Sequence, residues 1–212
     1  MGLKVTVKPE SEPLELDEVK LHLRVDHDDE DSLIESMIAA AREYCENFCR
    51  RSFITQTLTF TLDEFPSVGV KASCYDGYKR KYTDYIELPN GPVQSIESLE
   101  YWDTTEDEYI EIEAADYQLS NSSAVVDRLA PAPNTSWPTP QSGRLDAVKV
   151  QYIAGYGDDG EDVPRAIRNA MLLLIATWYA NREAFLLATS GQAFPTPVGV
   201  DALLWGERSY SP

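Results

Sequence analysis

The segment from residue 162 to residue 186, DVPRAIRNAMLLLIATWYANREAFL, is apolar almost all the way round its middle. Asp162 can cap a helix and Pro164 suits a first turn, so we expect one helix of about 24 residues here. Residues 170–176 carry no polar side chain, which predicts burial on several sides. The run is shorter than the roughly 20 apolar residues that cross a bilayer. Because a chain of 212 residues can cover such a helix only partly, we expect a second copy to cover the rest.

The charge of the chain excludes some functions. Lys and Arg number 18 against 36 Asp and Glu, which gives a formal net charge of -18. Proteins that coat DNA or RNA need a basic surface, and so do proteins that dock on anionic lipid, so neither role fits. Two interpretations of the charge stay open. It keeps a soluble protein dispersed, or it forms a surface that nucleic acid passes without adhering.

The cysteines and the first residues indicate where the chain folds. Cys45, Cys49 and Cys74 are too few and too unevenly spaced for a disulfide framework, and no histidine lies at zinc-ligand spacing from them. We interpret them as reduced core residues. Residues 1–15 lack the apolar region of a signal peptide, so we expect folding in a reducing cytoplasm.

Hydrophobic periodicity predicts helices at both ends of the chain and strands between them. This order predicts an α+β protein, with a small helical core from the N- and C-terminal segments and a β-rich antiparallel insertion. The expected boundaries are 1–52 for the N-terminal helices, 53–160 for the insertion and 161–212 for the C-terminal helices. Besides the segment above, helices are expected over 16–25, 31–50 and 200–205. Strands are expected over 55–62, 85–88, 93–102, 109–112, 117–119, 125–129 and 148–152, with a long hairpin tip or loop over 67–84.

A search for chemistry yields no catalytic, cofactor or metal site, so we do not expect an enzyme. The acidic run from His27 to Asp31 lacks the ligand spacing of a calcium loop and fits a solvated cap. The loop over 155–160 lacks the Lys and Ser/Thr of a phosphate loop. The basic cluster of Lys79, Arg80 and Lys81 fits either a solvated hairpin tip or a contact with an acidic partner or a DNA backbone.

Five segments, in order along nearly the whole chain, resemble one known family. The most specific feature is the LHLRVD…DD combination together with the VP…WYANRE helix. The chain resembles the head–tail connector (adaptor) proteins of long-tailed bacteriophages, which are often labelled phage DNA-packaging proteins. The segments are LDEVKLHLRVDHDDEDSLIESMIAAAREYCENFCRRSFITQT at 16–57, IELPNGPVQSIESLEYWD at 86–103, VKVQYIAGYGDDGEDVPRAI at 148–167, WYANREA at 178–184 and PTPVGVDALLW at 195–205.

The resemblance implies a structural protein of the virion, placed at the head–tail junction and made in the cytoplasm of a bacterial host. It implies a ring of twelve copies under the portal protein, which extends the DNA channel and receives the stopper or tail. DNA would pass through this ring without specific binding, and no membrane would be involved. The stretch over 67–84 is a departure that leaves the shape of the β part open.

The expected subunit contacts follow from the apolar helix. Subunit contacts are expected at Met171, Leu174, Ile175, Trp178 and Tyr179, with Arg182 and Glu183 as a polar rim. The resemblance implies that the C-terminal segment docks on the portal, and by position this portal-docking tail comprises Val200, Leu203, Leu204 and Trp205. An alternative function is a β-rich carbohydrate- or protein-binding accessory module of a phage virion, with Trp102, Trp137 and the tyrosines as a stacking platform.

Overall fold

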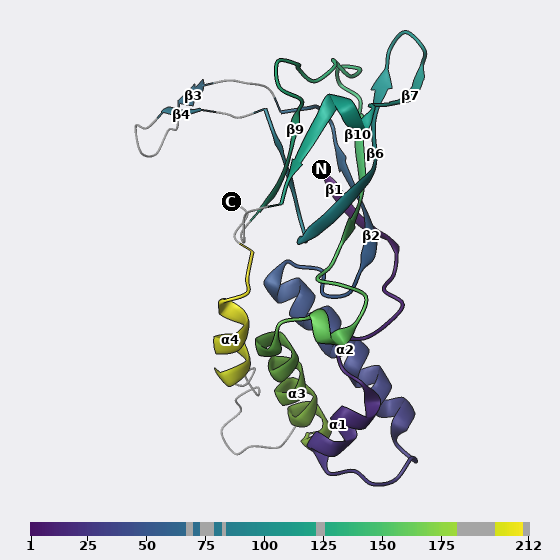
Figure 1. Ribbon diagram of the computed structural model, residues 1–212, viewed down its shortest axis with the longest axis vertical. Coiled ribbons are helices and arrows are strands. Elements are labelled where there is room, and N and C mark those ends of the chain that lie inside the picture. Colours follow the sequence, from purple (N-terminus) through teal and green to yellow (C-terminus); the bar gives the residue numbers. More distant parts are fainter. Residues whose placement is uncertain (67–69, 73–78, 82–83, 122–125, 182–197, 210–212) are drawn as a thin grey trace. The chain divides into compact units, whose positions relative to one another are not determined.

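The chain forms two compact units in the computed structural model (Figure 1). The structure describes residues 1–66, 70–72, 79–81, 84–121, 126–181 and 198–209, and for 70–72, 79–81 and 198 the description covers the backbone alone. We call the part formed by 1–8 and 56–154 the β unit, and the part formed by 9–55 and 155–209 the helical unit. The expected α+β class, with the helices of both chain ends in one core and antiparallel strands between them, is confirmed.

The helical unit contains two helices from each end of the chain: α1 Leu16–Leu23, α2 Asp31–Cys49, α3 Arg165–Ala180 and α4 Val198–Trp205. Helix α3 is shorter than the expected span over 162–186, because Pro164 and not Asp162 occupies its N-cap. Asp162 instead ends a short 3-10 turn, Gly160–Asp162, in a capping box with Asp159. The last residues of the expected span, 182–186, lie outside the described residues.

The core of the helical unit forms where the apolar stripes of its helices meet. Helix α2 buries positions that recur every three or four residues, as a helix with one covered face requires. Helix α3 contacts α1, α2 and α4, so its apolar middle is covered from several directions. The buried side chains of these two helices are Ile34, Ile38, Ala41, Cys45, Cys49, Ile167, Ala170, Met171, Leu174 and Ile175.

The β unit contains a five-stranded antiparallel sheet with strand order β1-β2-β10-β6-β7. A three-stranded sheet, β5-β9-β8, shares its hydrophobic core, and β3 and β4 pair only with each other among the described strands. The bounds are β1 Gly2–Val7, β2 Gln56–Leu62, β3 Val70–Ala72, β4 Lys79–Lys81, β5 Ile86–Leu88, β6 Val93–Asp103, β7 Glu108–Glu111, β8 Tyr117–Ser120, β9 Asp127–Pro131 and β10 Val148–Ala154.

Alternation of apolar and polar residues places the core of the β unit. Leu58, Phe60 and Leu62 of β2 are buried, and the threonines between them turn to the other face. Tyr152 of β10 is fully buried opposite Leu58, and its hydroxyl donates a 2.6 Å hydrogen bond to the carbonyl of Pro89. Burial raises the pKa of this phenol. The tyrosine thereby satisfies its one polar atom inside the core.

The described units differ from the expected boundaries mainly at the amino end. Residues 1–52 were expected to belong to the helices, but Gly2–Val7 form strand β1 and pair with β2. At the other boundary, Gly155 and the loop after it belong to the helical unit, where the amide of Tyr156 donates to the carbonyl of Phe53 at 3.0 Å. Each difference arises because a short segment pairs with a distant part of the chain.

Candidate interaction surfaces

Three of the expected subunit-contact residues lie in the core of their own chain. Met171 and Ile175 are 0% exposed and Leu174 is 3% exposed. The neighbouring helices of the same chain supply the cover that the apolar segment needs. The expectation that these side chains face another subunit is therefore corrected: they stabilise the helical unit itself.

The other expected contact residues lie at the edge of this core. Trp178 is half-buried and meets the ring of Tyr44 edge-on, with 6.4 Å between the ring centroids. Tyr179 is also half-buried, and its hydroxyl donates to the Glu30 carboxylate. Both side chains therefore keep part of their surface open. Arg182 and Glu183 lie outside the described residues.

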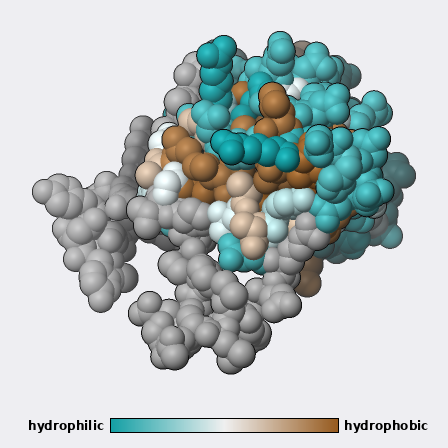
Figure 2. Space-filling view, turned by 90° about the horizontal axis from the view of Figure 1, so that it is seen from below, coloured by the Kyte–Doolittle hydropathy of each residue, from teal (hydrophilic) through white to brown (hydrophobic). Residues whose placement is uncertain are grey.

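A further side of α3, on which Leu173 lies beside Gly199 of α4, carries mostly apolar side chains that are not part of the core. Leu173 is 40% exposed, Ala180 is exposed, and Ala176 and Thr177 are half-buried. These positions recur at helical spacing, and we call them the outer face of α3. Figure 2 shows that hydrophobic residues gather in part of the visible surface, with hydrophilic residues around them. A helix face of this kind, with one leucine among small side chains, suits close packing against another helix.

The expected portal-docking tail packs onto its own helical unit. Val200 and Leu204 of α4 are 0% exposed, and Leu203 is half-buried. Trp205 remains 50% exposed, with its ring edge-on to Phe48 at 6.2 Å. Helix α4 thus uses one side to dock within its own chain and leaves the side with Trp205 accessible.

Polar contacts hold the segment after α4 in place. Arg51 donates from Nε to the carbonyl of Glu207 at 2.6 Å, and the amide of Ser209 donates to the carbonyl of Cys49 at 2.8 Å. The guanidinium of Arg208 lies 5.2 Å from the ring centroid of Trp205, within the range of a cation–π contact. The position of α4 therefore depends on contacts along its length and beyond its last residue.

A buried charge network links α2 to the segment before α1. Arg42 is 8% exposed; its guanidinium donates to Glu12 at 2.8 Å and to Glu46 at 2.9 Å. The Glu46 carboxylate also accepts a hydrogen bond from the backbone N–H of Phe53 at 2.8 Å. Burial raises the pKa of the Glu46 carboxyl. Burial alone would lower the pKa of Arg42, but its two carboxylate partners raise it above its ordinary value. The network is structural, since each group is occupied by the others.

The acidic run after α1 is tied back to that helix. Lys20 donates to Asp28 at 2.6 Å and lies 2.8 Å from Asp31. These bonds raise the pKa of Lys20, and the bond from Lys20 lowers that of Asp28.

Within the described ranges, no group of three or more His, Cys, Asp or Glu side chains is arranged to hold a metal ion. None of the helices described is long and apolar enough to cross a membrane.

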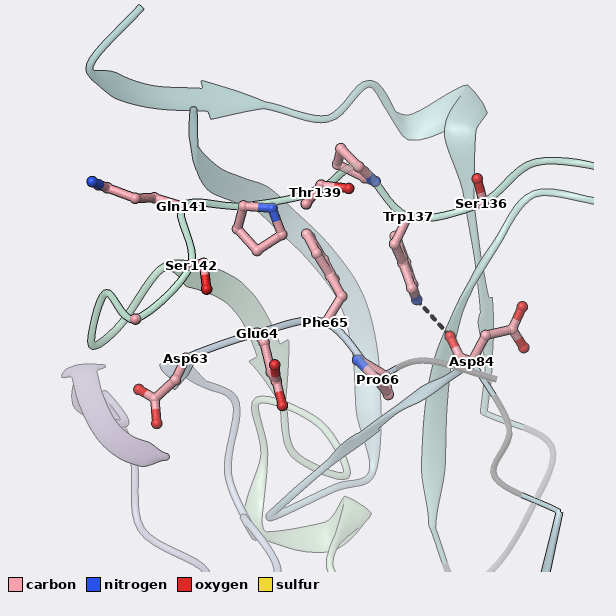
Figure 3. A pocket seen from close by; sticks show the side chains of 13 residues that line it. Asp63, Glu64, Phe65, Pro66, Asp84, Ser136, Trp137, Thr139, Gln141 and Ser142 are labelled. Carbon is pink, nitrogen blue, oxygen red and sulfur yellow. Dashed lines mark hydrogen bonds between the residues drawn. The ribbon is translucent and has the colours of Figure 1, made fainter. Parts of the chain in front are cut away.

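The β unit has a hollow beside Trp137, which we call the Trp137 hollow (Figure 3). Its volume is about 410 Å³. The rings of Trp137 and Phe65 lie stacked, with 4.9 Å between centroids and 11° between planes. The indole Nε1 donates to the carbonyl of Asp84 at 2.5 Å. One face of Trp137 is thus covered by Phe65, so the ring is fixed as part of the wall.

A second hollow of about 510 Å³ lies beside strand β7, and we call it the β7 hollow. Ile110 and Ile112 line it together with Trp137, and acidic residues stand around them. It shares Ser136, Trp137 and Pro138 with the first hollow, so both hollows adjoin this tryptophan loop. The acidic residues that line it are Glu111, Glu113 and Asp116.

The expected stacking platform of the alternative function is occupied by internal contacts. The Arg144 guanidinium lies 3.5 Å from the ring centroid of Trp102, and Tyr109 meets that ring edge-on at 4.9 Å. Trp137 is stacked on Phe65, as described above. Neither ring offers two free faces for a sugar.

The expected basic contact at Lys79, Arg80 and Lys81 forms strand β4, which pairs with β3. The side chains of these residues lie outside the described part of the chain. Strand β1 lies outside the segments expected to form strands, and it carries a further surface. Its sequence GLKVTV alternates apolar and polar residues, and this signal could have identified it.

Comparison with known proteins gives one family and several structures. The model of the phage gp6-like head-tail connector protein family matches residues 13–130, more than half of the chain. No curated protein gives a significant match. The fold is similar to that of a chain in the neck of an empty GTA particle computed with C6 symmetry, with TM-score 0.75, 22% identity and coverage of 100% of this chain and 97% of that one. It is also similar to a chain in the virion of a native gene transfer agent (GTA) particle, with TM-score 0.74, 22% identity and the same coverages of 100% and 97%. A third similar chain is in the neck of the native GTA particle computed with C12 symmetry, with TM-score 0.69, 20% identity and again 100% and 97% coverage.

Proposed function

The chain belongs to the phage gp6-like head–tail connector family, and from this premise we propose that its copies form a ring beneath the portal of a tailed phage. A member of this family is a structural protein of the phage head–tail connection, which is not a class of enzyme. In the proposal, twelve copies extend the DNA channel of the portal and receive the stopper or tail on their far side. The family match over residues 13–130 is the observation that carries the proposal.

The ring is supported by the kind of particle in which similar chains occur. The similar chains belong to particle necks whose structures were computed with C6 and C12 symmetry. Rotational symmetry requires each subunit to offer two different surfaces, one for each neighbour. Exposed surfaces in both units of this chain are available for that purpose.

For the helical unit, we propose the outer face of α3 as a subunit contact. Leu173 is its most exposed large side chain at 40%, and small residues beside it allow another helix to approach closely. Trp178 and Tyr179 remain proposed contact residues of this helix, with Arg182 and Glu183 as the polar rim. This assignment moves the contact from the covered side of α3 to its accessible side.

For the portal, we propose a contact through the accessible side of α4. Trp205 is 50% exposed and Leu203 is half-buried, while Val200 and Leu204 fix the helix to its own unit. A half-exposed tryptophan is a frequent centre of protein–protein contacts, because it buries a large area with little loss of side-chain freedom.

The basic strand with Lys79, Arg80 and Lys81 remains a proposed contact with an acidic partner or a DNA backbone.

The negative charge supports a role as a conduit for DNA. Each copy carries a formal net charge of -18, and a ring multiplies it. Carboxylates that face a channel repel the phosphate backbone, so DNA slides through without being held. Retention of DNA by the purified chain at low salt in a gel-shift assay would contradict this part of the proposal.

The test of the proposal replaces Leu173 by glutamate. Heads that carry the portal but lack this chain are mixed with the purified variant and with tails, and joined particles are counted by electron microscopy. We expect Leu173→Glu to reduce joining at least tenfold, because a buried unpaired carboxylate at each contact costs several kcal/mol. The circular dichroism spectrum of Leu173→Glu should match that of the wild type, since Leu173 lies outside the core.

The matched control is Leu21→Glu, the same substitution at a leucine of α1 that is 81% exposed. We expect this variant to join heads to tails as the wild type does. Normal joining by Leu173→Glu would remove the outer face of α3 from the contact. A wild-type chain that neither binds these heads nor supports joining would overturn the proposed function as a whole.

A further inference from the structure

Strand β1 is an edge strand with an unusual degree of exposure. All six of its residues are exposed, although the strand alternates apolar and polar side chains. Leu3, Val5 and Val7 are 40%, 43% and 52% exposed. Within the described residues β1 pairs with β2 alone, so its outer backbone edge is open. Natural proteins cover or interrupt long apolar edges, because such edges add a further strand readily.

The register shows that β1 continues the core face of the sheet. Leu3 lies opposite Phe60, and Val5 lies opposite Leu58. Residues directly opposite each other project from the same face, and these two partners on β2 are buried. The cover over the core face therefore ends at β2 and leaves an apolar strip on β1.

The other edge of the same sheet is strand β7, and its side chains complement those of β1. Ile110 of β7 lies opposite Tyr101, which packs against the core, so Ile110 is on the same face as Leu3 and Val5. The β7 hollow opens on this side, with Ile110 and Ile112 among its lining residues. The second edge thus offers a recess with two isoleucines and an acidic surround on the face where the first edge offers an apolar strip.

The opposite face of the sheet carries complementary charges at the two edges. A continuous row of paired residues runs from Gly2 through Thr61, Lys149 and Glu100 to Glu111. Lys4 follows Gly2 by two residues, so its side chain is on the same face as that of Glu111. One edge therefore presents a cation and the other a carboxylate, both in residues that are exposed.

We infer that β1 of one copy lies along β7 of the next copy, so that the sheet continues from subunit to subunit. Leu3 and Val5 then enter the β7 hollow of the neighbour, and Lys4 approaches its Glu111. Four antiparallel pairings separate β1 from β7, so the two strands run in the same direction and form a parallel pair across the contact. The contact joins two different surfaces, as a closed ring requires. This inference rests on the proposed function, because it assigns one contact of the proposed ring.

Contacts between like edges fit less well. Two copies of β1 around a twofold axis would bring Lys4 toward Lys4, and two copies of β7 would bring Glu108 and Glu111 together. Like charges in facing strands are unfavourable. Only the unlike pair joins the apolar strip to the isoleucines of the β7 hollow and a cation to a carboxylate.

Disulfide trapping tests the contact in the full-length chain. The variant carries Lys4→Cys and Glu111→Cys in a Cys74→Ala background, while the native Cys45 and Cys49 are buried and stay in place. Purified protein is oxidised during assembly with portal-bearing heads and examined on a non-reducing gel. We expect a ladder of covalent oligomers well beyond the dimer, because each copy contributes one cysteine to each of two neighbours.

Two controls separate the possible outcomes. A matched pair, Lys4→Cys with Glu97→Cys, places the second cysteine at an exposed residue of the inner strand β6, and it should give no ladder. Lys4→Cys alone should stay monomeric. Dimers from Lys4→Cys alone would show a like-edge contact and overturn the inference. If the cysteine variant joins heads to tails but gives no ladder, the inferred contact between β1 and β7 is also wrong. The open edge of β1 would then be available to a strand of another virion protein.

Charge reversal gives a second, independent measurement. Lys4→Glu or Glu111→Lys alone should weaken each subunit contact about fivefold, as expected when a surface pair changes from attraction to repulsion. The double variant Lys4→Glu with Glu111→Lys should restore joining of heads to tails to near the wild-type level. Equal defects in the single and double variants would refute the pairing. Failure of the wild-type chain to join heads to tails would instead refute the proposed function on which the inference rests.

Discussion

Helix α4 should be held to its own chain by a measurable free energy, and Leu204→Ala measures it. Leu204 is 0% exposed and lies in the core of the helical unit with Val200. The substitution removes three carbons, worth about 2.4 kcal/mol at about 0.8 kcal/mol for each buried group. A residual cavity adds to this loss, and Leu→Ala substitutions in cores cost roughly 2–5 kcal/mol.

The position of α4 sets an upper bound on the effect. The helix has eight residues and lies near the end of the described chain, so it can detach when its anchoring weakens. Its two fully buried side chains contribute roughly 1.5–3 kcal/mol each. We therefore expect Leu204→Ala to lower the free energy of unfolding of the helical unit by about 2–3 kcal/mol. Adding Val200→Ala should cost less than it does alone, because a detached helix has little more to lose.

Urea unfolding followed by tryptophan fluorescence provides the assay, since Trp178 and Trp205 both lie in this unit. With a slope of about 2 kcal/mol per molar urea, the midpoint should fall by about 1–1.5 M. The matched control is Ala202→Ser at an exposed position of the same helix, which should change the free energy by less than about 0.5 kcal/mol. A Leu204→Ala midpoint within error of the wild type would refute the packing of α4 on its own chain.

Two further expectations concern the helical unit. Burial raises the pKa of Glu46 above its ordinary 4.5, so the folded state binds this proton more tightly than the unfolded state. Between the ordinary and the raised pKa, the free energy of unfolding of the wild type should therefore fall, relative to that of Glu46→Gln, as the pH rises. If urea titrations give the two proteins parallel profiles of unfolding free energy against pH, this expectation is wrong. Gly155 has φ +145°, and an added Cβ would lie 2.6 Å from the backbone of Ile54. Gly155→Ala should therefore destabilise the unit by about 2–4 kcal/mol, and an unchanged thermal midpoint would refute the close approach.

The elements with one covered face were well predicted from the sequence. Strands β2 and β10 alternate strictly, and helix α2 carries a regular stripe, so periodicity located each within one or two residues of its observed bounds. Strand β1 has the same alternation, but it is short and its side chains are all exposed. Its partner strand begins about fifty residues later, and no local pattern specifies that pairing.

The candidate contact residues were harder to predict, for a physical reason. Apolar residues all round α3 correctly indicated burial, but periodicity does not reveal which chain provides the cover. In the structure that cover comes from α1, α2 and α4 of the same chain, so Met171 and Ile175 are core residues. The accessible side of α3, with Leu173, could be identified only once its neighbours were known.

The order of the segments along the chain has a consequence for biosynthesis. The helical unit needs residues from both before and after the β unit, and the five-stranded sheet needs both its amino-terminal strand and β10. A nascent polypeptide released before α3 has left the ribosome therefore lacks the partner that covers α2, and its apolar stripe stays exposed to chaperones and proteases. We therefore expect quality control to remove truncated products, so that finished molecules are the ones incorporated into a growing particle.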